Sequence, residues 1–489
     1  MSQKSINKNY KHLNPPLFPK GHIQYAATIS LLYTIIICLL WNPLSASSTD
    51  GVYTSTKHGT SVKRISGESD GDCIHCHDEH ASRDGVPTSG GPYDYLLFKR
   101  NDNDLCYTCH NLSGKNNVYQ GSTIYNSSSH ATDSNTYWPG TTPPARTSSD
   151  NGKCLNCHTP HGYKDASGLI PGLTFSREEK LCQTCHDGSP TTNIKGEITK
   201  TYRHPTSDYT DRHSQSEGDT PRDFGSSNRH AECVDCHNPH YAKSDASQRP
   251  PDASNLIKGV SGIDVINGLA GTHPSYNYIS PSTDISYEYQ LCFKCHSSWT
   301  TQPVGQSDMA TLFNYNNPSY HPIESAGKNL NINDDAFVNR WTSTSKMYCS
   351  DCHTSDNTLI RGPHGSSNNH ILKKNYPVTS HTAVSTELCF DCHKYDTYAN
   401  NDFTPTPPLT KEIIWGYSRF NLHIKHVVEE QVSCYSCHNS HASTSLKHLI
   451  VTGRTPGVTA YTESPNTSTA GNCTSTCHAK EDYTITYAR

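Results

Sequence analysis

The chain has 489 residues, of which only 33% are apolar, and its formal net charge at pH 7 is -5. The mean hydropathy of -0.72 excludes a protein held together by a large apolar core, because so few apolar side chains cannot offset the entropy lost on ordering such a chain. The acidic balance also argues against a nucleic-acid partner, since binding to phosphate backbones requires a basic surface.

Residues 1–46 are typical of an export signal. Four lysines and no acidic residue accompany an apolar run from Ala26 to Trp41, and small residues follow the run. The run has 16 residues, whereas a membrane-spanning helix needs roughly 20. We therefore expect cleavage after Ala46 and no membrane span in the mature chain. Cys38 would leave with the signal.

Ten cysteine motifs follow, nine of them Cys-x-x-Cys-His and the tenth, CTSTCH, with one residue more. This spacing is typical of c-type haem attachment, because each of the two thiols can bond one haem vinyl group while the adjacent histidine binds iron. Tetrahedral zinc sites would not require a histidine directly after every second cysteine. We therefore expect ten covalently attached haem c groups, each with its iron. The attaching cysteines are Cys73, Cys76, Cys106, Cys109, Cys154, Cys157, Cys182, Cys185, Cys233, Cys236, Cys292, Cys295, Cys349, Cys352, Cys389, Cys392, Cys434, Cys437, Cys473 and Cys477. The iron-binding histidines of the motifs are His77, His110, His158, His186, His237, His296, His353, His393, His438 and His478.

The motifs come in pairs, which predicts five two-haem units at about residues 47–140, 141–225, 226–335, 336–420 and 421–489. Stretches rich in Ser, Thr, Asn, Gly and Pro separate the units, and such stretches are loops. The expected fold is mostly irregular coil with short α-helices, wrapped around a closely packed row of haems, with little or no β-sheet.

The second ligand of each iron decides between electron transfer and catalysis, because an open iron face can bind a substrate. Methionine cannot be the general ligand, since the mature chain holds only Met309 and Met347. A histidine instead follows the first motif of each unit by three residues, except in the fourth unit, where eight residues are inserted. These downstream histidines are His80, His161, His240, His364 and His441. Two trans imidazoles place their Cα atoms roughly 12 Å apart, and three residues span at most about 10 to 11 Å, so each is expected to bind a neighbouring haem.

A second set of histidines recurs upstream of each unit and completes the ligands for ten irons. It comprises His58, His130, His204, His321 and either His423 or His426. His273 is an alternative within the long third unit. No role is assigned to His213, His230, His370, His381 and His448, of which His381 is the strongest further candidate.

The segments GDCIHCHDEHAS at Gly71 and LCYTCH at Leu105, and again KCLNCHTPHG and LCQTCH, resemble the multihaem c-type cytochromes with doubled CxxCH motifs of metal-respiring bacteria. The resemblance covers the mature chain and implies covalent haem c, bis-histidine iron and electron traffic across the cell envelope. It implies a location outside the cell or on its outer surface, with the periplasm as the second choice. The implied partners are other multihaem cytochromes or copies of this chain, and extracellular electron acceptors such as metal oxides. Some relatives polymerise into haem filaments, so a filament subunit is one form of the expected function.

Two other functions compete with an extracellular electron carrier. A multihaem reductase would need an iron with an open position, often marked by lysine in place of the motif histidine, and no CxxCK occurs here. The chain is therefore expected not to be an enzyme. A soluble periplasmic electron shuttle is the second alternative. The CTSTCH motif either carries the tenth haem or forms a disulfide between Cys473 and Cys477.

Overall fold

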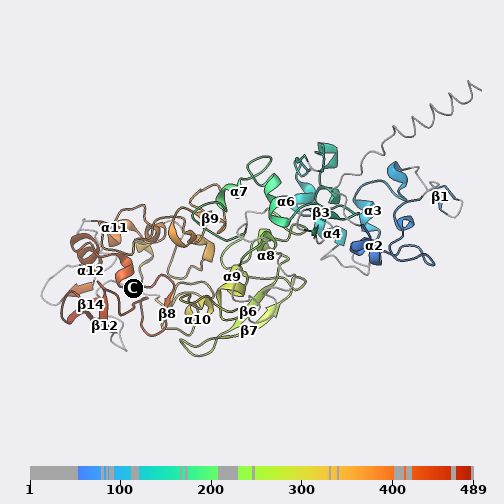
Figure 1. The fold of residues 1–489 in the computed structure, drawn as a ribbon. Helices are drawn as coiled ribbons and strands as arrows, with labels where there is room; N and C mark the ends of the chain where they lie inside the picture. The colour runs from blue at the N-terminus through green and yellow to red at the C-terminus, as the bar shows by residue number, and fades with distance from the viewer. Residues whose placement is uncertain are drawn as a thin grey trace, which may run out of the picture.

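The computed structural model shows an elongated body that follows the order of the chain (Figure 1). It runs from α2 and α3 at one end to α12, β12 and β14 at the other.

The expected export signal, His80 and His213 lie outside the described residues. Within the described part, every helix is too short or too polar to cross a membrane. The structure describes residues 53–78, 82–83, 86–87, 93–111, 121–141, 143–165, 168–170, 174–206, 230–244, 248–329, 332–338, 341–400, 412–414, 421–463 and 470–485.

The helices are short, as the sequence predicts. Helix α9, the longest in the described residues, has nine residues and contains the CFKCH motif. Short helices are marginal on their own because nucleation is costly, so these depend on what they pack against. The α-helices are α2 (Lys57–Ser61), α3 (Asn103–Tyr107), α4 (Gly121–Tyr125), α5 (Ser129–Thr132), α6 (Glu178–Cys185), α7 (Ile194–Glu197), α8 (Cys233–Cys236), α9 (Glu288–His296), α10 (Met309–Leu312), α11 (Tyr395–Tyr398) and α12 (Leu422–Ile424).

Most attachment motifs form a single helical turn. The first motifs of four units begin as 3-10 turns at Cys73–His75, Cys154–Asn156, Cys349–Asp351 and Cys434–Ser436. The backbone N–H of the motif histidine donates to the carbonyl of the first cysteine, at 2.8 Å for His77 and 2.9 Å for His353. One turn therefore brings the first cysteine and the histidine to the same side of the chain.

The tenth motif departs from this geometry. Its first cysteine, Cys473, lies in strand β13, and the backbone N–H of His478 donates to the hydroxyl of Ser475 at 3.1 Å. With one residue more between the cysteines, the four-residue hydrogen bond no longer joins the histidine to the first cysteine. The tenth motif thus lacks the turn that joins histidine to cysteine in the other motifs, and its first cysteine pairs within the sheet.

Strands are few and mostly paired in twos, which confirms the expected fold class. The antiparallel pairs are β1 with β2, β3 with β4, β5 with β9, β6 with β7, and β8 with β11. One four-stranded sheet, in the order β10-β14-β13-β12, closes the carboxyl end of the molecule (Figure 1). The strands are β1 (Ser82–Arg83), β2 (Val86–Pro87), β3 (Tyr163–Asp165), β4 (Gly168–Ile170), β5 (Tyr202–Arg203), β6 (Gly262–Ile266), β7 (Ser275–Ile279), β8 (Ser319–Tyr320), β9 (Gly365–Ser366), β10 (Glu412–Ile414), β11 (Ala442–Ser443), β12 (Val458–Glu463), β13 (Ala470–Ser475) and β14 (Glu481–Ile485).

The largest apolar cluster among the described residues surrounds α9 in the third unit. Phe293, inside the CFKCH motif, is only 1% exposed and lies at the centre of this cluster. Much smaller clusters occur beside it and near α11. Among the described residues, the largest side-chain core therefore belongs to the third unit. The principal cluster comprises Ile263, Tyr289, Phe293, Trp299, Ala310, Phe313, Ile323 and Met347.

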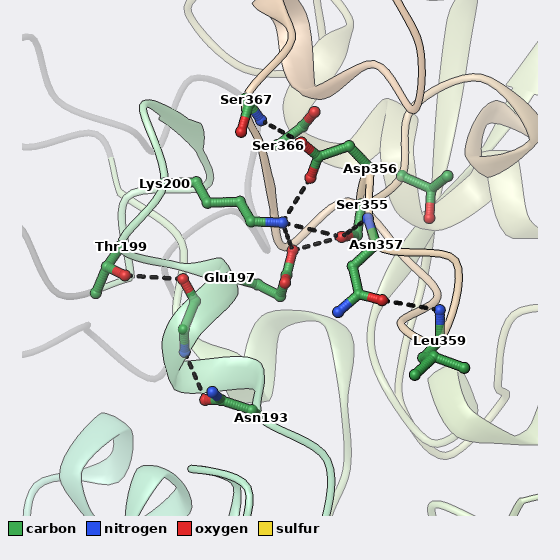
Figure 2. Close-up of polar contacts among 12 residues, drawn as sticks. Asn193, Glu197, Thr199, Lys200, Ser355, Asp356, Asn357, Leu359, Ser366 and Ser367 are labelled. Atoms are coloured by element: carbon green, nitrogen blue, oxygen red, sulfur yellow. Dashed lines mark hydrogen bonds and ion pairs between the residues drawn. The ribbon is translucent and has the colours of Figure 1, made fainter.

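A buried ionic network anchors the insertion that follows His353 (Figure 2). The Nζ atom of Lys200 lies 2.6 Å from Glu197 Oε2 and 2.5 Å from Asp356 Oδ1. The Ser355 hydroxyl donates to the same Glu197 oxygen, and Glu197 is only 4% exposed. The network thus joins α7 of the second unit to the inserted segment of the fourth.

The adjoining strand approaches α7 at the glycine of the PHG sequence. A Cβ atom on Gly365 would lie 1.9 Å from the carbonyl oxygen of Glu197, so only glycine fits there. Gly365 pairs with Arg203 in β5, and His364 immediately precedes it. These contacts fix the position of His364 despite the insertion.

We predict that Lys200→Met lowers the free energy of unfolding by about 1 to 3 kcal/mol, because it leaves the buried Glu197 carboxylate without its cation. The substitution retains the apolar stem, and the loss would be measured by denaturant titration of the holoprotein. Lys425→Met is the matched control, since Lys425 pairs with Glu429 and Glu430 at the surface. Equal destabilisation by both substitutions would contradict a specific role for the network.

Candidate functional site: opposed histidine rings

Each of the ten motif histidines faces a second histidine ring. In the first motifs, the ring centroids are separated by 6.1 Å for His77–His161, 5.8 Å for His158–His240, 6.0 Å for His237–His364, 6.0 Å for His353–His441 and 6.2 Å for His438–His423. In the second motifs, they are separated by 5.8 Å for His110–His58, 6.2 Å for His186–His130, 6.2 Å for His296–His204, 6.5 Å for His393–His321 and 6.0 Å for His478–His426.

These separations match two imidazoles that share one metal ion. A metal-to-imidazole bond is about 2 Å long and the ring centre lies about 1.2 Å beyond the nitrogen, so two rings on one metal have centres roughly 6.4 Å apart. Rings in direct van der Waals contact would instead lie about 3.5 to 4 Å apart. The observed spacing thus fits an iron between each pair of rings.

The pairs follow a rule that connects neighbouring units. The first motif of a unit faces the downstream histidine of the next unit, as His77 faces His161. The second motif faces the upstream histidine of its own unit, as His110 faces His58. Each of the first four units thus receives one ring from its successor.

The fifth unit has no successor in this chain and draws both opposing rings from one segment. His423 lies in α12 and faces His438, whereas His426 lies in the following π-helical turn Lys425–Glu429 and faces His478. The sequence presented His423 and His426 as alternatives, and the structure uses both. The sequence prediction therefore assigned one opposing ring too few to this segment. The signal was present in the sequence HIKH, which contains both histidines.

The Nδ1 atoms of many of these rings pair with backbone carbonyls. The motif histidines His77, His237, His353 and His438 each place Nδ1 2.8 Å from a carbonyl, of Tyr95, Leu256, His370 and His448 respectively. Because a carbonyl can only accept, Nδ1 carries the proton and the lone pair of Nε2 is left for a metal.

The upstream histidines form the same kind of bond with the segment that carries the downstream histidine. Nδ1 lies 3.1 Å from the Pro160 carbonyl for His58, 3.0 Å from Pro239 for His130 and 2.7 Å from Pro363 for His204, and His321 bonds to Ser440. Each accepting residue directly precedes a downstream histidine. The two opposing rings that a unit needs are therefore tied together.

Burial keeps these rings in the form that binds metal. Burial, reinforced by neighbouring His321, lowers the pKa of His393 to about 3. Burial, reinforced by His353, likewise lowers the pKa of His441 to about 3. Neutral imidazole is the ligand form, and both rings hold it at neutral pH.

The cysteines mark contacts between successive units. The thiol of Cys106 lies next to that of Cys154, and the thiol of Cys389 lies next to that of Cys434. The same contact recurs between Cys182 and Cys233 and between Cys292 and Cys349. Each joins the second motif of one unit to the first motif of the next.

Two of these contacts include a carboxylate. The ligand atoms of Glu178, Cys182 and Cys233 lie within 4.8 Å of one another, as do those of Glu288, Cys292 and Cys349. Glu178 also accepts from the backbone N–H of Val234 at 2.8 Å, inside the next motif. Such groups could hold a metal ion, but thiols of haem attachment motifs become thioethers, so we interpret them as junctions between haem sites.

The remaining histidines have other partners. His273 lies 2.8 Å from Asp308 and is 73% exposed, so His321 rather than His273 faces a motif ring. His381 pairs with Glu387 at 2.8 Å and His448 with Glu463 at 3.2 Å. His230 lies 3.7 Å from Glu232. The carbonyl of His370 accepts from His353.

Comparison with known proteins supports the interpretation of the motifs. Residues 68–114, 148–191 and 343–397 match the doubled CXXCH motif family, and they contain the paired motifs of the first, second and fourth units. No curated protein and no solved structure has significant similarity to the chain. The matched motifs indicate covalently bound c-type haem. These three segments thus have the doubled CXXCH motifs of multihaem c-type cytochromes.

Proposed function

We propose that the chain is a secreted decahaem cytochrome that carries electrons between the cell and an extracellular acceptor. The observation that supports this proposal most strongly is the set of ten opposed histidine pairs, one for each attachment motif. When bound, haem iron supplies one-electron redox chemistry. The protein's own residues attach it, hold it from both sides and cover it.

Irons held by two imidazoles favour electron transfer over catalysis. A reductase needs an iron position that a substrate can occupy, whereas here each motif histidine already has a ring opposite it. The ten opposing ligands in this proposal are His58, His130, His161, His204, His240, His321, His364, His423, His426 and His441. His80 then has no motif histidine left to serve within this chain.

The contacts between sites support a single row of haems in the order of the sequence. For each of the first four units, one hydrogen bond joins one opposing ring to the segment that carries the other, as His58 bonds to Pro160 beside His161. Between units, first cysteines touch, as Cys106 touches Cys154. The two kinds of contact alternate along the chain, so every haem site adjoins the site before it and the site after it.

A filament remains part of the proposal but the ligand set does not require it. The fifth unit obtains both opposing rings from the segment that contains α12, so no iron depends on a histidine from another copy. Metal oxides and other multihaem cytochromes are the partners we propose, and electron exchange with either needs only close approach of a haem edge.

We predict that the intact holoprotein carries a mass increment of ten haems. Replacing both Cys473 and Cys477 by alanine should reduce the increment to nine, because the tenth motif alone would lose its thiols. Native mass spectrometry measures both values. An increment of nine in the unaltered protein would show that the longer motif is not loaded.

We predict that the reduced protein does not bind carbon monoxide and that His161→Ala binds about one equivalent. The substitution removes the ring opposite His77 and opens one iron position. His273→Ala is the matched control, since His273 pairs with Asp308 and should leave carbon monoxide binding absent. Binding by the unaltered protein at neutral pH would instead favour a reductase.

Carbon monoxide titration also distinguishes the two opposing histidines at the start of the fifth unit. His423→Ala and His426→Ala should each admit one equivalent of carbon monoxide, and the double variant two, because the rings face different motif histidines. A variant that binds none would show that its histidine is not a ligand.

A further inference from the structure

The opposed rings fall into two geometric classes that the sequence does not reveal. In the five pairs of the first motifs, the ring planes are nearly parallel, at 17° for His77–His161, 11° for His158–His240, 17° for His237–His364, 15° for His353–His441 and 12° for His438–His423. In the five pairs of the second motifs, the planes are rotated, at 37° for His110–His58, 83° for His186–His130, 50° for His296–His204, 49° for His393–His321 and 37° for His478–His426. The two ranges do not overlap.

Hydrogen bonds from Nδ1 fix the ring planes. In three first motifs the accepting carbonyl begins a pair of residues in the left-handed region. The φ angles are 61° and 56° at Tyr95-Leu96, 58° and 56° at His370-Ile371, and 56° and 60° at His448-Leu449. Residues with a side chain adopt this conformation at a cost of about 1 to 2 kcal/mol each. A strained pair in the same place in three units indicates that the carbonyl is held there to orient the ring.

In the second motifs the fixed ring is the opposing one. In four of the five pairs its Nδ1 bonds to the residue before a downstream histidine, as His130 bonds to Pro239, and in the fifth pair His426 Nδ1 bonds to the carbonyl of Leu422. In those four pairs the accepting carbonyl belongs to the segment that carries the downstream histidine. In the first motifs it belongs to the loop that follows the motif. The ring that is held by a carbonyl, and the segment that supplies the carbonyl, therefore differ between the two classes.

We infer that the ten irons form two electronically distinct sets of five that alternate along the chain. The inference rests on the proposed bis-histidine ligation of every iron. Each imidazole donates π density into the iron d orbital perpendicular to its plane. Parallel rings raise the same orbital and separate it from its partner, whereas crossed rings raise both and leave them nearly equal in energy.

This orbital difference affects the redox equilibrium of each site. The separation of orbitals stabilises the ferric state, because the lowered orbital then holds two electrons and the raised orbital only one, whereas in the ferrous state both orbitals are full and the separation brings no gain. Crossed rings lose part of this stabilisation, so the second site of each unit is more readily reduced than the first when other influences are equal. An electron that travels along the row therefore meets sites of alternating affinity.

Electron paramagnetic resonance of the oxidised holoprotein at low temperature tests the inference. Parallel rings give a rhombic low-spin signal with three resolved g values, and strongly rotated rings give a signal dominated by one larger g value. The five nearly parallel pairs are expected to give a rhombic signal with about half of the spins by integration, and the rotated pairs to give the remainder at larger g values, the largest from His186–His130. A single rhombic signal from all ten irons would overturn the inference.

Two matched variants assign the signals to the classes. His161→Ala should reduce the rhombic intensity by about one fifth, whereas His130→Ala should leave it unchanged and reduce the signal with the larger g value. Reduction of the same signal by both variants would contradict the two classes. If either variant does not yield a haem-loaded protein, the integrated signal intensities of the unaltered protein still test whether there are two classes of iron.

The same spectrum separates this inference from the proposed function. High-spin ferric signals in the unaltered protein would show that irons lack a second histidine, and the proposed function would then fail. Low-spin irons of one kind only would leave the proposed function intact and overturn the two classes alone.

Discussion

The structure depends on one constraint, which is that two imidazole rings must face each other across the space of a single metal ion. Ring centres about 6 Å apart gain little from contact with each other, so their separation makes sense only with a group between them. Burial keeps the rings neutral, and carbonyls at Tyr95 and Pro160 turn their Nε2 atoms away from the backbone. The local turns, the short strands and the junctions between units all serve to place these rings.

The constraint also accounts for how so polar a chain can fold. The principal apolar cluster lies around α9, and the units on either side of it have few buried apolar side chains. Covalent haem would supply the missing apolar surface, so that binding and folding are coupled. The rule that each first motif faces a histidine of the next unit makes neighbouring units depend on each other. Strand pairs add longer connections, since β5 with β9 joins the second unit to the fourth and β8 with β11 joins the third to the fifth.

Local turns and the fold class could be predicted from the sequence, whereas contacts between segments far apart in the sequence mostly could not. The CxxCH spacing determines its own helical turn, because His77 bonds back to Cys73 within four residues. The limit on chain reach predicted that a histidine such as His161 serves a neighbouring site, and its ring faces His77 in the next unit back. The fold class followed from the loops and from the absence of long apolar patterns. The four-stranded sheet around Cys473 was not predicted, because the effect of one additional residue depends on the strands beside it.

Other parts of the site lay beyond sequence reasoning for physical reasons. His423 and His426 are three residues apart, and only the helical turn that carries both shows that each can face a different motif. His273 and His321 both precede proline, and the choice between them depends on Asp308, which holds His273 at the surface. The angles between ring planes depend on backbone carbonyls, which are present at every residue and leave no signature in side-chain identity.

The most direct test of the account is a crystal structure of the holoprotein with anomalous diffraction measured at the iron absorption edge. The account predicts ten iron peaks in one row, in the order of the motifs, each midway between a motif histidine and the opposing ring named above. An iron bound by one histidine alone, or successive motifs whose irons are not neighbours, would contradict it.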